Sequence, residues 1–146
     1  MTAADIDPVI EIAASLGEAP QWPRDSYLAA ANPSALPVRV ALVAEEGTSK
    51  AIIGFAIANL IPPEAELETI AVAAAFQRRG LARQLFSEMA EKLQQSRVTV
   101  VSLEVRVSNV PARSFYASLG FATTGLRPHY YANPVEDAVI MSLTVG

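Results

Sequence analysis

The chain has 146 residues, of which 51% are hydrophobic and 18% are charged, a composition typical of a globular protein rather than a disordered one. Its formal net charge of −4 argues against nonspecific nucleic-acid binding, which requires a basic surface. Because the chain contains no cysteine, disulfide bonds, thiolate metal sites and cysteine nucleophiles are excluded.

The length and the apolar runs set the expected organisation. The length suits one domain over residues 1–146. Residues 1–15 lack the basic start of a signal peptide, and no apolar run reaches the roughly 18 residues of a membrane span. We therefore expect a cytoplasmic monomer or weak dimer without a membrane or direct nucleic-acid partner.

The N-terminal region predicts two short helices. Asp7 suits the N-cap of the first helix, Pro8 its first helical position and Gly17 its C-terminal cap. A second helix is expected over residues 23–32. The single tryptophan, Trp22, precedes it and has two interpretations that remain open, a core side chain or a wall of a substrate groove.

The middle of the chain predicts a hairpin followed by a strand–helix–strand unit. Apolar runs at 38–45 and 51–60, joined by the polar segment 46–49, indicate the hairpin. Residues 67–72 alternate as a strand does, and residues 98–107 form a β-branched, buried strand expected to run parallel to it. The helix between them has one apolar face, formed by Leu81, Leu85, Met89 and Leu93.

The C-terminal region predicts a helix over 110–119, closed by Gly120, and then two strands. These strands are expected at 121–126 and 138–145, on either side of a polar, aromatic connection at 127–131. The elements together predict one α/β domain with a mixed sheet.

The turn before the long helix is a candidate anion site. Unpaired amides and the helix dipole favour anions at a helix N-terminus, and Arg78, Arg79 and Arg83 add full positive charges. Leu81 and Ala82 follow Gly80, so the Lys-Ser/Thr pair of a Walker phosphate loop is missing, as are the three glycines of a dinucleotide fingerprint. Spacing alone leaves a phosphate site and an ordinary helix start as alternatives.

A second cluster lies on the next strand and helix. The segment 103–109 reads Leu-Glu-Val-Arg-Val-Ser-Asn, and segment 116–121 reads Tyr-Ala-Ser-Leu-Gly-Phe. Together with residues 77–82, these segments resemble the GNAT acetyltransferase superfamily. Segment 103–109, Tyr130-Tyr131 and residues 136–141 are closer to its ribosomal-protein-alanine N-acetyltransferases, the RimI branch.

The resemblance implies a fold and a co-substrate. The fold is a mixed sheet of six to seven strands with about four helices, in which two parallel central strands splay apart to bind acetyl-CoA. The implied cofactor-binding residues are Ile70, Ala71, Val72, Gln77, Arg78, Arg79, Gly80, Leu81, Ala82, Arg83, Asn109 and Tyr116. Asn109 also suits an N-cap. The family often has glycine where Ala82 stands, and its usual first strand has little room before Asp7.

The resemblance also implies catalytic roles. A protein α-amine has a pKa of roughly 7.7–8.0, so a general base assists its attack on the thioester. Glu104 matches the family's base and Tyr116 its general acid, with Glu66 and Glu68 as rival bases. One histidine, His129, and no cysteine make a metal site unexpected.

The expected acceptor is a protein or peptide N-terminus, by resemblance the N-terminal alanine of a ribosomal protein. The residues expected to border it are Trp22, Glu68, Tyr130 and Tyr131. A small-molecule amine as acceptor, and a non-catalytic acetyl-CoA-binding protein, are the alternatives.

Overall fold

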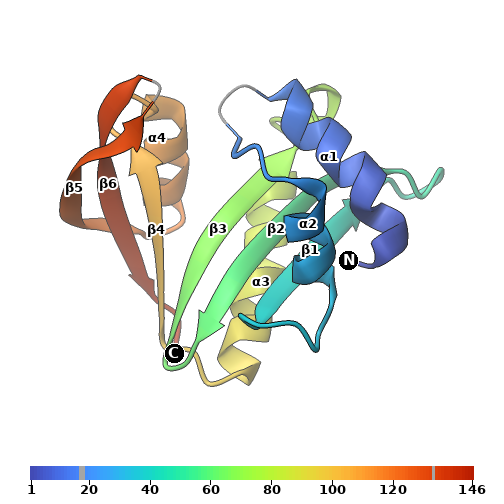
Figure 1. Ribbon diagram of the computed structural model, residues 1–146, viewed down its shortest axis with the longest axis horizontal. Coiled ribbons are helices and arrows are strands. Elements are labelled where there is room, and N and C mark those ends of the chain that lie inside the picture. The colour runs from blue at the N-terminus through green and yellow to red at the C-terminus, as the bar shows by residue number, and fades with distance from the viewer. Residues whose placement is uncertain (17–18, 133) are drawn as a thin grey trace.

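The computed structural model describes residues 1–16, 19–132 and 134–146, which contain six strands arranged as one sheet in the order β1-β2-β3-β4-β6-β5. The sheet is mixed, because β3 and β4 are parallel while every other neighbouring pair is antiparallel (Figure 1). The elements are η1 (Ala3–Asp5), α1 (Ile6–Ser15), α2 (Arg24–Ala31), β1 (Arg39–Glu45), β2 (Ile52–Ile61), β3 (Glu64–Val72), η2 (Ala74–Phe76), α3 (Leu81–Gln95), β4 (Val100–Arg106), α4 (Val110–Ser118), β5 (Ala122–Ala132) and β6 (Val135–Thr144).

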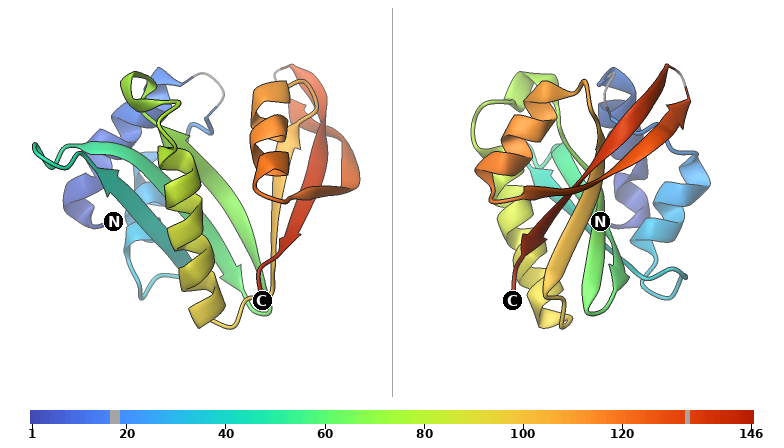
Figure 2. Two further views of the ribbon diagram at one scale, coloured as in Figure 1. Left: turned by 180° about the vertical axis from the view of Figure 1, so that it is seen from behind. Right: turned by 90° about the vertical axis from the view of Figure 1, so that its left-hand side faces the viewer.

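Helices cover both faces of the sheet. The helices α1 and α2 pack against one face of β1–β3, while α3 and α4 lie behind the sheet (Figures 1 and 2). Successive residues of β2 serve the two layers in turn, since Phe55 and Ile57 face α1 and α2 whereas Ala56 and Ala58 face α3. None of the helices in the described ranges is both long and apolar enough to span a bilayer.

The two parallel strands separate along their length. They pair only near their starts, at Glu64 with Val100, Ala65 with Val101 and Glu66 with Ser102. Beyond that point β3 continues to Val72 and β4 continues to Arg106, but the two strands no longer pair with each other. Their separation gives the V-shaped opening in Figure 1. The implied splay between two central parallel strands is therefore confirmed.

The predicted start of the first helix was wrong by two residues. The helix begins at Ile6 with Asp5 as its N-cap, after the short turn η1. Pro8 is tolerated at the third helical position because the N–H of that position has no partner within a helix anyway. The expected cap at Gly17 lies outside the described residues. Among the described residues, the element that precedes α1 is the short 3-10 helix η1 and not a strand.

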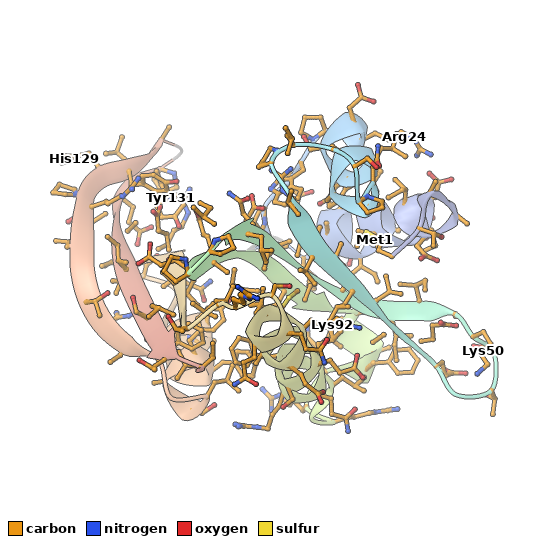
Figure 3. All side chains as sticks on the ribbon, turned by 90° about the horizontal axis from the view of Figure 1, so that it is seen from below. Met1, Arg24, Lys50, Lys92, His129 and Tyr131 are labelled. Carbon is orange, nitrogen blue, oxygen red and sulfur yellow. The ribbon has the colours of Figure 1, made fainter. Side chains whose placement is uncertain are left out.

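The predicted connection at 127–131 was also wrong, because these residues belong to β5. The strand pairs with β6 from Ala122 to Ala132, with register shifts on both sides of Arg127. His129 adopts φ 55° within this irregular stretch. Figure 3 shows Tyr131 on the side of β5 that faces the opening of the sheet and His129 on its outer side. Although β6 lies between β5 and β4, the side chains of Arg127 and Tyr131 reach Glu104 and Arg106 of β4.

Candidate active site

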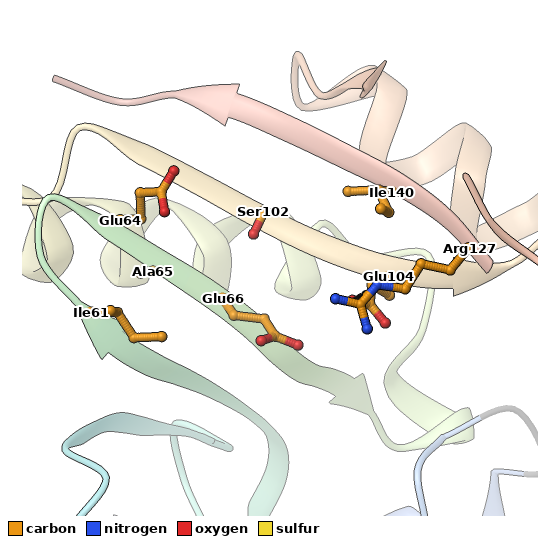
Figure 4. A pocket seen from close by; sticks show the side chains of 8 residues that line it. All are labelled: Ile61, Glu64, Ala65, Glu66, Ser102, Glu104, Arg127 and Ile140. Carbon is orange, nitrogen blue, oxygen red and sulfur yellow. Dashed lines mark ion pairs between the residues drawn. The ribbon is translucent and has the colours of Figure 1, made fainter. Parts of the chain in front are cut away.

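A cleft of about 260 Å³ lies where β3 and β4 separate (Figure 4). Alternation along β4 creates one wall, since Val101 and Leu103 are buried toward α3 and α4 while Ser102 and Glu104 point to the other face. The full lining is Ile61, Glu64, Ala65, Glu66, Ser102, Glu104, Arg127 and Ile140.

Glu104 has one engaged and one unengaged carboxylate oxygen. Its Oε1 lies 3.3 Å from Nε of Arg127, and its side chain is 16% exposed. Its Oε2 is buried and has no hydrogen-bond partner among the described residues. Buried polar atoms are almost always hydrogen-bonded in folded proteins, so this oxygen is suited to a donor that the chain itself does not supply.

Glu66 faces Glu104 across the cleft. Burial raises its pKa, the negative charges of Glu104 and Glu68 raise it further, and Arg127 opposes them. With Glu64 at its far end, the cleft is lined by three carboxylates and one guanidinium (Figure 4). This arrangement favours a cationic guest such as a protonated amine.

Glu68 and Trp22 do not line the cleft. Oε1 of Glu68 is 2.7 Å from Nε of Arg39, and both side chains are less than one-fifth exposed. The guanidinium of Arg39 lies 5.9 Å from the Trp22 ring centroid, and Trp22 stacks at 5.2 Å on the buried Tyr27. Glu68 is held in a structural ion pair, and Trp22 packs at the border of the α1–α2 core.

Tyr130 and Tyr131 of β5 interact with Glu104 from outside the lining of the cleft, and Tyr116 of α4 packs against the α3 side of the core and interacts with Tyr131. The rings of Tyr130 and Tyr131 meet edge to face at 5.0 Å, and Arg106 lies 4.3 Å from the Tyr131 centroid. The pKa of Tyr130 is raised chiefly by its side-chain interaction with the Glu104 carboxylate. Burial, helped by Tyr131, raises the pKa of Tyr116 to about 12, so this phenol stays protonated and can donate.

The turn before α3 presents a row of unused amides. No carbonyl of the described chain accepts from the backbone N–H groups of residues 78–83. Arg78 and Gly80 both adopt positive φ, 62° and 76°, a backbone alternation that points successive amides in one direction. The Gln77 side chain donates to the Val72 carbonyl oxygen at 3.0 Å and ties the turn to the end of β3. A diphosphate group fits this cradle.

The arginines of the turn differ in their contacts. Arg78 is exposed, and Arg79 lies 5.2 Å from the Phe76 ring centroid. Arg83 donates to the Ser118 hydroxyl at 2.9 Å and so connects α3 to α4 across the opening. All three arginines are exposed.

The remaining expected cofactor residues border the opening. Ile70, Ala71 and Val72 pair with β2 but lie beyond the last β3–β4 pair, so their edge toward β4 is unpaired. The Asn109 side chain accepts from the Ala112 amide at 3.2 Å and caps α4. The N-cap interpretation of Asn109 is therefore confirmed, and its contact with a cofactor stays a prediction.

Sequence reasoning singled out none of three polar residues of the cleft, Glu64, Ser102 and Arg127. Ser102 could have been found, because the period of β4 puts it on the same face as Glu104. For Arg127 the sequence indicated only that segment 127–134 borders the acceptor groove, because the position of Arg127 itself depends on the irregular register of β5.

Comparisons with known proteins agree with this architecture. The profile of the Acetyltransferase (GNAT) family matches residues 9–121. A Salmonella typhimurium ribosomal protein bS18-alanine N-acetyltransferase is 44% identical over 94 residues, covering 63% of this chain and 64% of the relative, so the match spans slightly less than two thirds of its length. A Bacillus subtilis relative is 32% identical over 148 residues, covering 100% of this chain and 93% of the relative.

A solved structure shows the same similarity over the whole chain. The ribosomal-protein-S18-alanine N-acetyltransferase of Escherichia coli superimposes with a TM-score of 0.83 at 28% identity. The superposition covers 100% of this chain and 91% of that one.

Proposed function

Because this chain belongs to the GNAT acetyltransferase family, we propose that it transfers the acetyl group of acetyl-CoA to the N-terminal α-amine of a protein. The observation that carries the proposal is that β3 lines the Glu104 cleft near its start and is tied at its end, through Gln77 and Val72, to the turn that carries the amide cradle of residues 78–83. The relatives' names extend it to the N-terminal alanine of ribosomal protein bS18, an acceptor that would place the enzyme in the cytoplasm.

The donor half of the site is built from backbone groups. The amides of residues 78–83 bind the diphosphate of the co-substrate, and Arg78, Arg79 and Arg83 add charge around it. The unpaired edge of Ile70–Val72 holds the pantetheine arm by strand-like hydrogen bonds. Acetyl-CoA supplies an activated thioester carbonyl; binding and orienting it is the work of these groups.

Glu104 acts as the general base. An α-amine is partly protonated at neutral pH and attacks a carbonyl only in its neutral form. The unengaged Oε2 of Glu104 accepts the proton, and Glu66 keeps the surroundings negative while the ammonium enters. Glu68 is the weaker rival, because it lies outside the lining of the cleft and its ion pair with Arg39 is the shorter one, 2.7 Å.

Tyr116 acts as the general acid. Its raised pKa keeps the hydroxyl protonated across the physiological range, so it donates to the sulfur as the carbon–sulfur bond breaks. The acceptor arrives as an ammonium ion and leaves as an amide, so it loses two protons. One of them replaces the proton that Tyr116 gave to the sulfur, and the other passes through Glu104 to solvent, so each transfer yields the amide, the CoA thiol and one released proton.

A panel of acceptors tests the proposal. The protein is incubated with labelled acetyl-CoA and with peptides bearing free or blocked N-termini, free amino acids or polyamines. Label on peptides with a free α-amine supports the proposal. Label only on amino acids or polyamines would replace the acceptor with a small amine, and binding of acetyl-CoA without turnover on any amine would indicate a non-catalytic binding protein.

A further inference from the structure

Arg127 lies at the mouth of the cleft with most of its donors unused. Its side chain is 56% exposed, its Nε is 3.3 Å from Oε1 of Glu104, and its guanidinium lies 5.3 Å from the Tyr130 ring centroid. Figure 4 shows the guanidinium beside the Glu104 carboxylate, in the space that Glu66 borders from β3. A guanidinium carries five N–H donors, and those on its two Nη atoms donate to no residue of the described chain.

Glu104 and Arg127 together offer two complementary positions. The Oε2 of Glu104 has no hydrogen-bond partner among the described residues, and the guanidinium that carries the Nη groups of Arg127 lies beside Oε1 of the same carboxylate. In an N-terminal residue the amine nitrogen and the carbonyl oxygen are separated by roughly 3 Å, because only three covalent bonds join them. A lysine side-chain amine has no carbonyl at that separation.

We propose that Arg127 selects α-amines, by donating to the carbonyl oxygen of the acceptor's first residue while Glu104 holds the amine. This inference rests on the proposed function, and it adds the feature by which the site distinguishes an N-terminus from other primary amines. The ion pair with Glu104 and the ring of Tyr130 hold the guanidinium on two sides, so its orientation is set before the acceptor binds.

The charge of Arg127 does not prevent an ammonium ion from entering. Glu64, Glu66 and Glu104 line the same cleft, so its net charge stays negative with Arg127 in place. Lysine could not replace Arg127, because an ammonium group is a point charge and cannot hold a carboxylate and donate to a carbonyl in one fixed plane.

Two isomeric acceptors isolate the position of the carbonyl. One peptide begins with alanine and the other with β-alanine, which moves the carbonyl one bond further from the amine and leaves the rest of the peptide unchanged. We expect Arg127→Ala to lower kcat/KM for the alanine peptide roughly 10–100-fold, the usual effect of losing a hydrogen bond to a charged group. The β-alanine peptide should change by less than about threefold, so the wild-type preference is lost.

Control variants separate this role from a charge or folding effect. Arg24 on α2 is a similarly exposed arginine in an ion pair (53% exposed), and Arg24→Ala should leave both rates unchanged. Arg127→Lys should also lose the preference. Parallel losses on both peptides in Arg127→Ala, or an Arg127→Lys variant equal to wild type on both, would overturn the inference. Failure of the proposed function looks different, since the wild-type protein would then acetylate neither peptide and the inference would fall with it.

Discussion

Replacing Glu104 by glutamine removes a charge and a proton acceptor while keeping the shape of the side chain. A general base contributes roughly 10²–10⁴-fold to a rate, which corresponds to about 2.7–5.4 kcal/mol of transition-state stabilisation. We therefore expect Glu104→Gln to lower kcat at least 100-fold at pH 7.

The same substitution should have little effect on folding. The ion pair that it breaks has a partner that is 56% exposed, and pairs of this kind are worth less than about 1 kcal/mol. Glutamine also removes the cost of keeping a mostly buried carboxylate with one unpaired oxygen. The melting temperature should stay within about 4 °C of wild type.

The assay is single-turnover acetylation of an alanine-starting peptide, with thermal unfolding measured on the same samples. Glu91→Gln, an identical chemical change on the exposed face of α3, is the matched control and should behave as wild type. A near-normal rate in Glu104→Gln with a large loss in Glu66→Gln or Glu68→Gln would move the base to β3. A loss of activity accompanied by a large fall in melting temperature would show that Glu104 is structural.

Three further substitutions test the surrounding site. Tyr116→Phe should lower kcat about 100-fold, and a normal rate would remove Tyr116 from the acid role. The raised pKa of Tyr116 makes the stability of the wild-type protein fall as the pH rises from 10 to 12, so the variant should lose less stability over that range. Gly80→Ala should raise the KM for acetyl-CoA but not the KM for the peptide, and it should lower the free energy of unfolding by about 1 kcal/mol, since φ is 76° at this position. Gly47→Ala, at a position with open space around it, is the control, and equal effects of the two substitutions would contradict the amide cradle. Arg39→Ala should lower the free energy of unfolding by about 3 kcal/mol, because it leaves the Glu68 carboxylate unpaired. Adding Glu68→Ala should restore part of that free energy in denaturant unfolding, and strictly additive losses would show that the two residues are not coupled.

The strand–helix–strand unit was predictable because its local signals agree. The alternation in β3, the four-residue apolar spacing of α3 and the β-branched run of β4 each match one period and one burial pattern. Leu85, Met89 and Leu93 are all buried as that spacing requires. The hairpin of β1 and β2 and the boundaries of α2 were predicted within two residues for the same reason.

The strand β5 was not predictable from its own residues. It is an edge strand whose side chains are mostly exposed, so no alternating apolar pattern marks it. Pro128 and His129 indicate a loop, yet a proline is compatible with an edge strand. The pairing with β6 decides the conformation, and pairing depends on residues elsewhere in the chain.

The site was predictable in part. The resemblance singled out Glu104 and Tyr116; Glu104 lines the cleft, whereas Tyr116 packs against the core on the α3 side of the sheet, and their catalytic roles stay predictions. The ion pairs of Glu104 with Arg127 and of Glu68 with Arg39 were not predictable, because each joins two strands whose relative register the sequence does not encode locally. Both carboxylates are ion-paired, and Glu104 differs from Glu68 in lining the cleft and in having an oxygen, Oε2, without a hydrogen-bond partner among the described residues.

The most direct test of the central claim locates the acetyl group on a defined product. A peptide with a free N-terminal alanine and one internal lysine is incubated with the wild-type protein and acetyl-CoA. Tandem mass spectrometry then shows which of the two amines carries the added acetyl group, about 42 Da. The proposed function predicts the acetyl group on the alanine nitrogen, with one CoA released for each peptide modified. Acetyl on the lysine alone, or no product while the protein binds acetyl-CoA, would contradict it.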